Sequence, residues 1–144
     1  MPYPPQMVKA FKEELTEIGF TDLVTAEAVD SAMKKAATGV TLVAINSVSG
    51  CAAAIARPGV RLALENTDHR PDQLLTVFAG QDLEATERMR SYLQDLPPSD
   101  PSFALFKDGE LVYFMPRYRI ESRDANAVAA DLHNAFDEFD EFDE

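Results

Sequence analysis

Residues 40–54 read Val40-Thr41-Leu42-Val43-Ala44-Ile45-Asn46-Ser47-Val48-Ser49-Gly50-Cys51-Ala52-Ala53-Ala54. The β-branched run at 40–45 predicts a buried strand, and the segment from Cys51 to Asn66 predicts a helix. Cys51, the only cysteine, therefore lies where a strand leads into a helix. The unpaired backbone N–H groups of a first helical turn favour a thiolate, so this position indicates a reactive thiol. A buried cysteine that packs as a small apolar side chain is the alternative.

The length and composition of the chain are those of one globular domain. It has 144 residues, of which 46% are hydrophobic and 9% aromatic. Six acidic residues and no basic one occupy the last eight positions. We therefore expect a single domain over residues 1–139 and an acidic C-terminal tail over residues 140–144. A solvated terminus and an interaction tail both fit this composition.

Charge and cysteine content narrow the classes of partner. The formal net charge of −12 argues against nucleic acid, whose phosphates need a basic face. No apolar run approaches the length of a membrane span, and the first residues carry no signal peptide pattern. A single cysteine excludes an internal disulfide framework, so we expect a reducing, cytoplasmic compartment.

Apolar periodicity and turn residues predict nine elements along the chain. The helices are expected at residues 5–19, 26–37, 51–66, 83–96 and 124–139, with Thr25 and Asp82 as N-caps and a kink at Pro58. The strands are expected at residues 40–45, 74–78, 102–106 and 110–115, the last two joined by a hairpin at Asp108-Gly109. This order predicts a four-stranded mixed sheet with helices on both faces.

Metal and phosphate sites are not indicated by the sequence. His69 and His133 are isolated, with no spaced histidine, cysteine or carboxylate that would complete a ligand set. The six glycines are scattered and form no phosphate-binding loop. We therefore expect no metal and no tightly bound cofactor.

The order of elements resembles the thioredoxin fold. Residues 100–112, which read Asp100-Pro101-Ser102-Phe103-Ala104-Leu105-Phe106-Lys107-Asp108-Gly109-Glu110-Leu111-Val112, resemble the thioredoxin segment that begins with a cis-proline and continues into two strands. Pro58 resembles the proline that kinks the thioredoxin active-site helix. The resemblance implies an α/β, thioredoxin-like fold with a four-stranded mixed sheet, flanking helices and extra N-terminal helices. It also implies a cis peptide bond before Pro101, which is otherwise rare.

A closer resemblance covers nearly the whole chain. Four separated blocks are similar to the bacilliredoxin A/B family, namely residues 42–53 with Ala56-Arg57-Pro58, residues 77–82, Pro101-Ser102, and Phe114-Met115-Pro116-Arg117. The resemblance implies a cytoplasmic thiol–disulfide oxidoreductase. Its members remove bacillithiol from mixed disulfides on client proteins, and they have also been described as disulfide isomerases. Bacillithiol would be a thiol co-substrate of this chain, and bacillithiolated proteins would be its clients.

The family motif Cys-Gly-Cys is altered in this chain to Ser49-Gly50-Cys51. Ser49 occupies the place of the nucleophilic first cysteine, and Cys51 matches the second, resolving cysteine. A serine hydroxyl stays protonated at neutral pH and does not exchange with disulfides, so we expect impaired activity. An introduced Cys→Ser change and a natural monothiol branch both account for this serine. Gly50 is expected to permit a tight turn that brings positions 49 and 51 together.

The resemblance also implies residues that contact the substrate. The backbone of Asp100 beside a cis Pro101 would pair with a client or thiol. Asn46, with Ser47 beside it, would donate hydrogen bonds to bound thiol, although polar residues at a strand end are often simple caps. Arg57 would contact a malate carboxylate of bacillithiol, and the same contact is implied for Arg117. A solvated or salt-bridged arginine is the alternative for both.

Three functions fit these observations. The first is a bacilliredoxin-type oxidoreductase impaired at Ser49. The second is a redox-inactive binding module that keeps the groove around Pro101, and the third is a monothiol carrier that uses Cys51. An exposed Cys51 favours the carrier, whereas a buried one favours the other two. We expect a monomer or weak homodimer.

Overall fold

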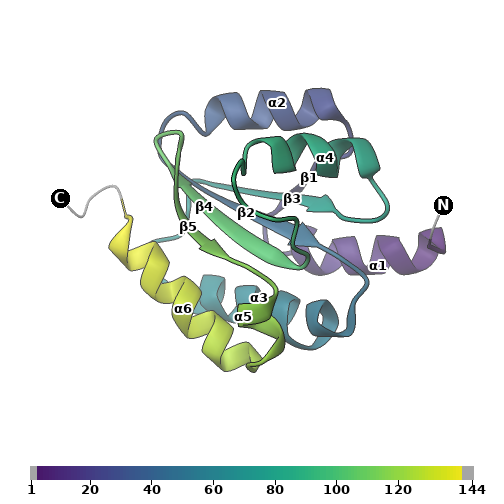
Figure 1. The fold of residues 1–144 in the computed structure, drawn as a ribbon. Coiled ribbons are helices and arrows are strands. Elements are labelled where there is room, and N and C mark those ends of the chain that lie inside the picture. The colour runs from purple at the N-terminus through teal and green to yellow at the C-terminus, as the bar shows by residue number, and fades with distance from the viewer. Residues whose placement is uncertain (1–2, 141–144) are drawn as a thin grey trace.

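The computed structural model describes residues 3–140, and it is built around a five-stranded mixed sheet (Figure 1). The strand order is β1-β3-β2-β4-β5. The strands are β1 (Thr21–Asp22), β2 (Val40–Asn46), β3 (Gln73–Phe78), β4 (Ser102–Lys107) and β5 (Glu110–Met115). Every residue of β2 is buried, because this strand lies at the centre and helices cover both of its faces.

The register of the sheet fixes where the strands end. β2 runs parallel to β3, with Asn46 opposite Phe78, and antiparallel to β4, with Ile45 opposite Ser102. The strand that leads to Cys51 therefore ends beside the start of β4, which follows Pro101. The predicted hairpin is confirmed: Asp108 and Gly109 both adopt positive φ, as a tight two-residue turn between twisted strands requires.

The predicted thioredoxin-like class is confirmed, but the sheet has five strands and not four. The additional strand, β1, pairs Thr21 and Asp22 with Leu75 and Thr76 of β3. Two residues are too few to show any periodicity, so only the tertiary pairing reveals this strand.

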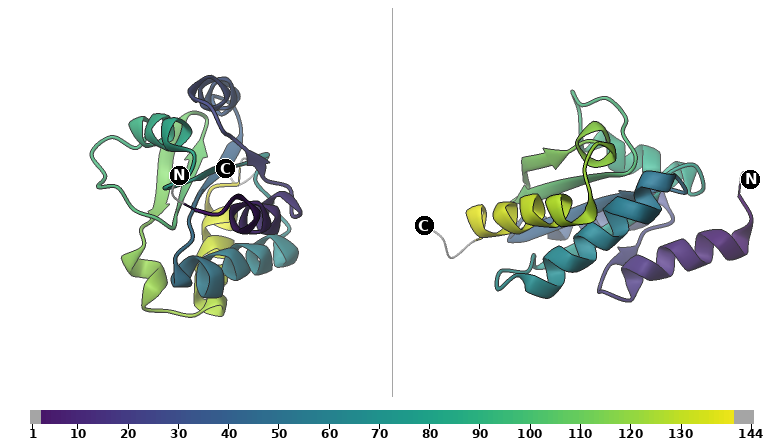
Figure 2. Two further views of the ribbon diagram at one scale, coloured as in Figure 1. Left: turned by 90° about the vertical axis from the view of Figure 1, so that its right-hand side faces the viewer. Right: turned by 90° about the horizontal axis from the view of Figure 1, so that it is seen from below.

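The helices form a layer on each face of the sheet. α1 (Pro5–Thr16), α3 (Arg57–Asn66) and α6 (Ala125–Glu138) lie on one face, and α2 (Ala26–Lys35) and α4 (Leu83–Ser91) on the other (Figures 1 and 2). Alternate residues of β2 supply the two cores: Leu42 and Ala44 face the first layer, and Val43 and Ile45 the second. Leu15 of α1 is buried in the first core, so this helix packs on its own sheet.

The helix boundaries agree with those predicted from the sequence, with a few exceptions. Thr25 caps α2, because its side chain accepts from the Ala28 N–H. The prediction that Asp82 caps α4 in the same way is wrong, because its carboxylate pairs instead with Lys12 at 2.7 Å. α1 and α4 also end earlier than expected, at Thr16 and Ser91. A short helix that was not predicted, α5 (Tyr118–Glu121), follows β5.

A wider helical turn precedes Pro58, the position at which a kink is expected. Residues Ala52–Ala56 form a π-helical turn, η1, in which the Arg57 N–H donates to the carbonyl of Ala52. α3 then begins at Arg57, so Pro58 lies in its first turn, where the missing N–H of proline is tolerated. The π turn accommodates the proline without breaking the helix that follows Cys51.

Gly59 allows α3 to approach α6 closely, and these helices run side by side in Figure 2. A Cβ at Gly59 would lie 2.8 Å from Val128 Cγ1 and 3.2 Å from the Ala125 carbonyl oxygen. A Cβ at Gly50, at the start of the same helical segment, would meet no atom within 4 Å. The two glycines therefore differ in packing.

We predict that Gly59→Ala lowers the free energy of unfolding by about 1–2 kcal/mol, because the added methyl overpacks the contact with Val128. Gly50→Ala is the matched control and should raise it by up to about 1 kcal/mol, because alanine restricts the unfolded chain. Urea unfolding of both variants checks this. Equal effects at the two positions would contradict the assigned close approach.

A second prediction concerns pH. His69 Nδ1 lies 2.8 Å from Asp137 Oδ1, and Nε2 lies 3.3 Å from Asp140 Oδ2. The hydrogen bond to Asp137, aided by the charges of Asp140, Asp137 and Asp68, raises the pKa of His69 above its ordinary value. The folded state therefore holds this proton more tightly than the unfolded chain does. Its contribution to stability is fully present below about pH 6.5 and is lost as the pH rises through the raised pKa.

His69→Gln should remove this pH dependence and leave the rest of the stability profile in place. Urea unfolding between pH 5 and 8 measures it, the pH range being set by the ordinary histidine pKa of about 6.5. The assignment is contradicted if the variant and the unaltered chain lose stability in parallel over that range.

Candidate functional site

The candidate site is formed where β2 leads into η1. Asn46 ends the strand, residues 47–49 form a loop, and Cys51 directly precedes η1. This loop lies at the carboxyl ends of the parallel strands β2 and β3. Ser49 and Cys51 are both partly exposed, and Gly50 is exposed. The structure thus places the altered motif at the surface, at the start of the helix.

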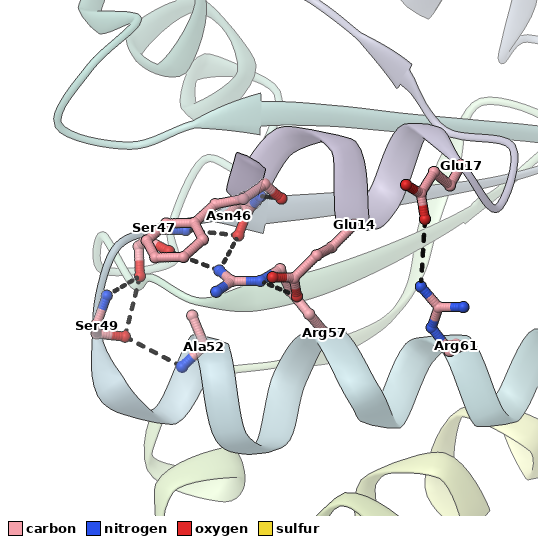
Figure 3. A network of polar contacts seen from close by, with 9 residues as sticks. Glu14, Glu17, Asn46, Ser47, Ser49, Ala52, Arg57 and Arg61 are labelled. Atoms are coloured by element: carbon pink, nitrogen blue, oxygen red, sulfur yellow. Dashed lines mark hydrogen bonds and ion pairs between the residues drawn. The ribbon is translucent and has the colours of Figure 1, made fainter. Parts of the chain in front are cut away.

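Ser49 acts as an N-cap for that helix. Its carbonyl accepts from the N–H groups of Ala52 and Ala53, and its Oγ accepts from the Ala52 N–H at 3.2 Å (Figure 3). Ser47 Oγ contacts Ser49 in two ways. It lies 3.0 Å from Ser49 Oγ, and it accepts a hydrogen bond from the Ser49 N–H at 3.2 Å. A small polar side chain at position 49 is therefore part of the local hydrogen bonding.

The side chains of Ser49 and Cys51 face each other. Ser49 Oγ lies 3.5 Å from Cys51 Sγ, within hydrogen-bond reach for a sulfur atom. The expectation that Gly50 is needed for this turn is wrong, because its φ is not positive and a side chain there would meet open space. An ordinary helical turn brings positions 49 and 51 together.

A buried arginine supports the loop from beneath. Arg57 is only 3% exposed, and its Nη1 donates to Asn46 Oδ1 and to the Ser47 carbonyl, both at 2.9 Å (Figure 3). Its Nε donates to Glu14 Oε1 at 2.8 Å. Arg57 is therefore in an internal salt bridge, which was one of the two alternatives for this residue. Arg57 therefore holds the loop in place.

Asn46 is committed to the same network. Its Oδ1 also accepts from the Ser47 N–H at 2.9 Å, and its Nδ2 donates to the carbonyl of Phe11 at 3.3 Å. The residue is buried. These bonds make it a cap at the strand end, as the alternative interpretation of this residue predicted.

Two residues of α1 complete the network and were missed by the sequence analysis. Glu14 forms an ion pair with Arg57. The Phe11 ring stacks against the guanidinium of Arg57, with 4.3 Å between the Arg57 Cζ atom and the ring centroid. Such a contact between a cation and an aromatic face is favourable. Phe11 belongs to the apolar stripe of α1 and Glu14 to its polar side. Nothing in that pattern links either of them to a loop more than thirty residues away.

The cis-proline loop carries the remaining predicted residues. The Asp100–Pro101 bond is cis, as the resemblance implied. The Asp100 carboxylate pairs with Arg90 at 3.0 Å, while its backbone carbonyl accepts from Arg117 Nη1 at 3.4 Å. A hydrogen bond to Glu121, aided by the charges of Glu121 and Asp100, raises the pKa of Arg117. Because Ile45 of β2 lies opposite Ser102 of β4, the cis-proline loop and the loop that leads to Cys51 lie at the same end of the sheet.

Other kinds of site find little support in the described part of the chain. His133 and His69 both contact Asp137, yet within residues 3–140 no group of three or more histidines, cysteines and carboxylates is arranged to hold a metal ion. None of the helices within that range has the length and apolar character to cross a membrane. The acidic tail at 140–144 lies outside the described residues except for Asp140.

Comparison with known proteins relates the chain to disulfide isomerases and bacilliredoxins. A sequence model of the family described as Disulphide isomerase matches residues 3–140. A protein named Bacilliredoxin from Salinibacter ruber is 54% identical over 139 residues, which cover 96% of this chain and 82% of that protein. A second Bacilliredoxin, from Cytophaga hutchinsonii, is 50% identical over 136 residues and covers 94% of this chain and 98% of its own length.

Solved structures with a similar fold include thioredoxins. Fasciola hepatica thioredoxin superposes with a TM-score of 0.57 at 19% identity, covering 83% of this chain and 99% of its own. A mutant thioredoxin from Halobacterium salinarum gives a TM-score of 0.55 at 18% identity, covering 86% of this chain and 93% of its own. At this level of identity the likeness establishes the fold and nothing further.

The network beneath the loop leads to a third prediction. Arg57→Met should lower the free energy of unfolding by about 3 kcal/mol, because it removes the side-chain donor to the Ser47 carbonyl, one of the two donors to Asn46 Oδ1 and the ion pair with Glu14. Arg61→Met is the matched control: Arg61 lies one turn along α3, and its pair with Glu17 is long (3.8 Å) and exposed (Figure 3). Its loss should change stability by no more than about 0.5 kcal/mol. Urea unfolding compares the two, and similar losses would contradict the role of Arg57.

Proposed function

Because the chain belongs to the bacilliredoxin family of thiol–disulfide oxidoreductases, we propose that it acts on mixed disulfides between bacillithiol and cytoplasmic client proteins, with its two-cysteine cycle blocked at Ser49. The observation that carries the proposal is the 3.5 Å distance from Ser49 Oγ to Cys51 Sγ. The site has the spacing needed by two exchanging sulfur atoms, and oxygen occupies one of the two positions.

With cysteine at position 49, the cycle would take two exchange steps. The thiolate of residue 49 attacks the bacillithiol sulfur of the mixed disulfide, the S–S bond breaks, and the client leaves as a thiolate. Cys51, as a thiolate, then attacks the sulfur of residue 49 and expels bacillithiol as a thiolate. The product is a disulfide between residues 49 and 51. Two further low-molecular-weight thiols must reduce it in successive exchange steps and leave as their own disulfide. A ring so short is strained and easily reduced.

Ser49 stops this cycle at its first step. Its hydroxyl is far too weak an acid to provide the anionic nucleophile at neutral pH, and its Oγ already accepts from the Ala52 N–H. The cis-proline loop around Asp100 and Pro101, which we propose binds the client, is separate from the side chain at position 49. We therefore expect binding of clients without turnover, by a monomer or weak homodimer.

A second candidate function is that of a monothiol carrier, which the partial exposure of Cys51 favours. In this case the Cys51 thiolate attacks the mixed disulfide itself, takes up bacillithiol and releases the client thiolate. An external thiol is then needed to free Cys51 again. The binding module without any exchange is the remaining possibility, and the experiment below distinguishes all three.

The fourth prediction is that Ser49→Cys restores clearance of a bacillithiolated client by at least about 100-fold over the unaltered chain, since exchange depends on the thiolate. Intact mass spectrometry follows bacillithiol on the client and on the protein. Ser47→Cys is the matched control: it adds a second thiol beside Ser49, but at a buried position. Ser49→Cys combined with Cys51→Ser should accumulate the adduct on residue 49.

The outcomes separate the candidates. Uptake of bacillithiol on Cys51 of the unaltered chain identifies the carrier. Failure of both the unaltered chain and Ser49→Cys to react leaves the binding module. Equal clearance by Ser47→Cys and Ser49→Cys would show that the spacing of positions 49 and 51 has no special role.

A further inference from the structure

The atom at position 49 lies among hydrogen-bond donors. Ser49 Oγ accepts from the Ala52 N–H at 3.2 Å, and Ser47 Oγ lies 3.0 Å away. Because Ser47 Oγ already accepts from the Ser49 N–H, its own proton is available to the atom at position 49. Hydrogen bonds of this kind favour an anion over its protonated form. The loop therefore suits a negatively charged atom at this position, although serine does not become one.

A buried cation lies directly behind this loop. The side chain of Arg57 is 3% exposed, and its Nη1 donates to the Ser47 carbonyl at 2.9 Å (Figure 3). Ser47 thus contacts Arg57 through its backbone and position 49 through its hydroxyl. A charge in an interior of low dielectric acts more strongly on its neighbours than a charge in water does. The positive charge of Arg57 therefore acts on position 49.

The carboxylate partner of Arg57 offsets this charge only in part. Glu14 Oε1 lies 2.8 Å from Arg57 Nε, but the Glu14 side chain is 43% exposed and is screened by water. The Phe11 ring that stacks on the guanidinium carries no formal charge. Within residues 3–140, Arg57 Nη2 is buried and has no hydrogen-bond partner. The cation is therefore incompletely neutralised on the inner side of the loop.

Other charged side chains around the motif are paired closer to the surface. The cis-proline loop lies at the same end of the sheet as the motif, and α5 and α6 both pack against η1. The arginines of this region form ion pairs in which every side chain is at least 26% exposed. These pairs are Arg90 with Asp100, Arg117 with Glu121, and Arg119 and Arg123 with Asp131. Arg57 differs from them in its burial and in its direct bond to the loop.

We propose that Arg57 is a positioning residue whose buried charge, acting through Ser47, favours the thiolate of a cysteine at position 49. Glu14 limits this effect by offsetting part of the charge. The inference rests on the exchange chemistry proposed above, which begins with a thiolate at that position. The proton that the thiol loses passes to solvent, and Arg57 itself transfers neither a proton nor an electron. In the present sequence the arrangement is retained although serine occupies the position.

The test uses a chain with one thiol, Ser49→Cys combined with Cys51→Ser, and measures the pKa of that thiol. The rate of its alkylation by iodoacetamide is followed by intact mass from about pH 4 to pH 10, because the thiolate is the reacting form. Adding Arg57→Met should raise the pKa by about 1, which lowers the thiolate fraction about 10-fold well below the pKa. Adding Arg57→Lys, which keeps the charge, should leave the pKa within about 0.3 of its starting value.

Glu14→Gln provides the opposite change and keeps the buried arginine. In the same one-thiol chain it should lower the pKa by about 0.5, because the cation loses the carboxylate that offsets it. Glu14 is partly exposed, so this variant tests the proposal even if Arg57→Met does not fold. Glu17→Gln is the matched control. It removes the same charge three residues along the chain, where the pair with Arg61 is long and exposed, and should change the pKa by less than about 0.2.

The outcomes decide between charge and loop geometry. A rise that is as large in Arg57→Lys as in Arg57→Met assigns the effect to loop geometry and overturns the proposal. A pKa that is unchanged or raised in Glu14→Gln, or lowered equally in Glu17→Gln, also overturns it. The measurement uses neither client nor bacillithiol, so it is independent of turnover. If the pKa values shift as expected but Ser49→Cys fails to clear a bacillithiolated client, the proposed function fails and the role of Arg57 stands.

Discussion

The geometry of the site depends on the buried guanidinium of Arg57. One side chain joins α1 through Glu14, the end of β2 through Asn46, and the loop through the Ser47 carbonyl. A buried cation is tolerated only when it is paired and hydrogen-bonded, so these partners have to stay in place. The loop that carries Ser49 is thereby fixed in position relative to the sheet. The first helix, far from the motif in sequence, becomes part of its support.

Local structure and chemistry make different demands on position 49. The structure needs a small side chain that accepts from the Ala52 N–H, and serine does this well. The family chemistry needs a thiolate, which serine does not provide. In the proposed mechanism, serine in place of the family's cysteine therefore retains the loop and lacks the nucleophile. A chain with about half its residues in common with bacilliredoxins can therefore keep this loop with serine at the first motif position.

The two arginines of the site show how burial assigns roles. From the sequence, Arg57 and Arg117 have the same two alternatives, contact with an anion or an internal salt bridge. Arg57 projects from the first turn of α3 toward α1 and β2, where it is enclosed. Arg117 follows β5 at the surface and remains half exposed. Only the packing of the helices on the sheet distinguishes them, because the charge and size of the two side chains are identical.

The sequence by itself determined the α/β class, most helices and strands, the hairpin at Asp108-Gly109 and the motif at residues 49–51. These follow from local periodicity, turn chemistry and family resemblance, all of which act over a few residues or a short motif. Tertiary structure decided the strand Thr21–Asp22, the π turn before Pro58 and the network of Phe11, Glu14 and Arg57. Each depends on contacts between segments distant in sequence or on how a helix fits its neighbours. Their energies arise only after the chain has folded, so no local pattern records them.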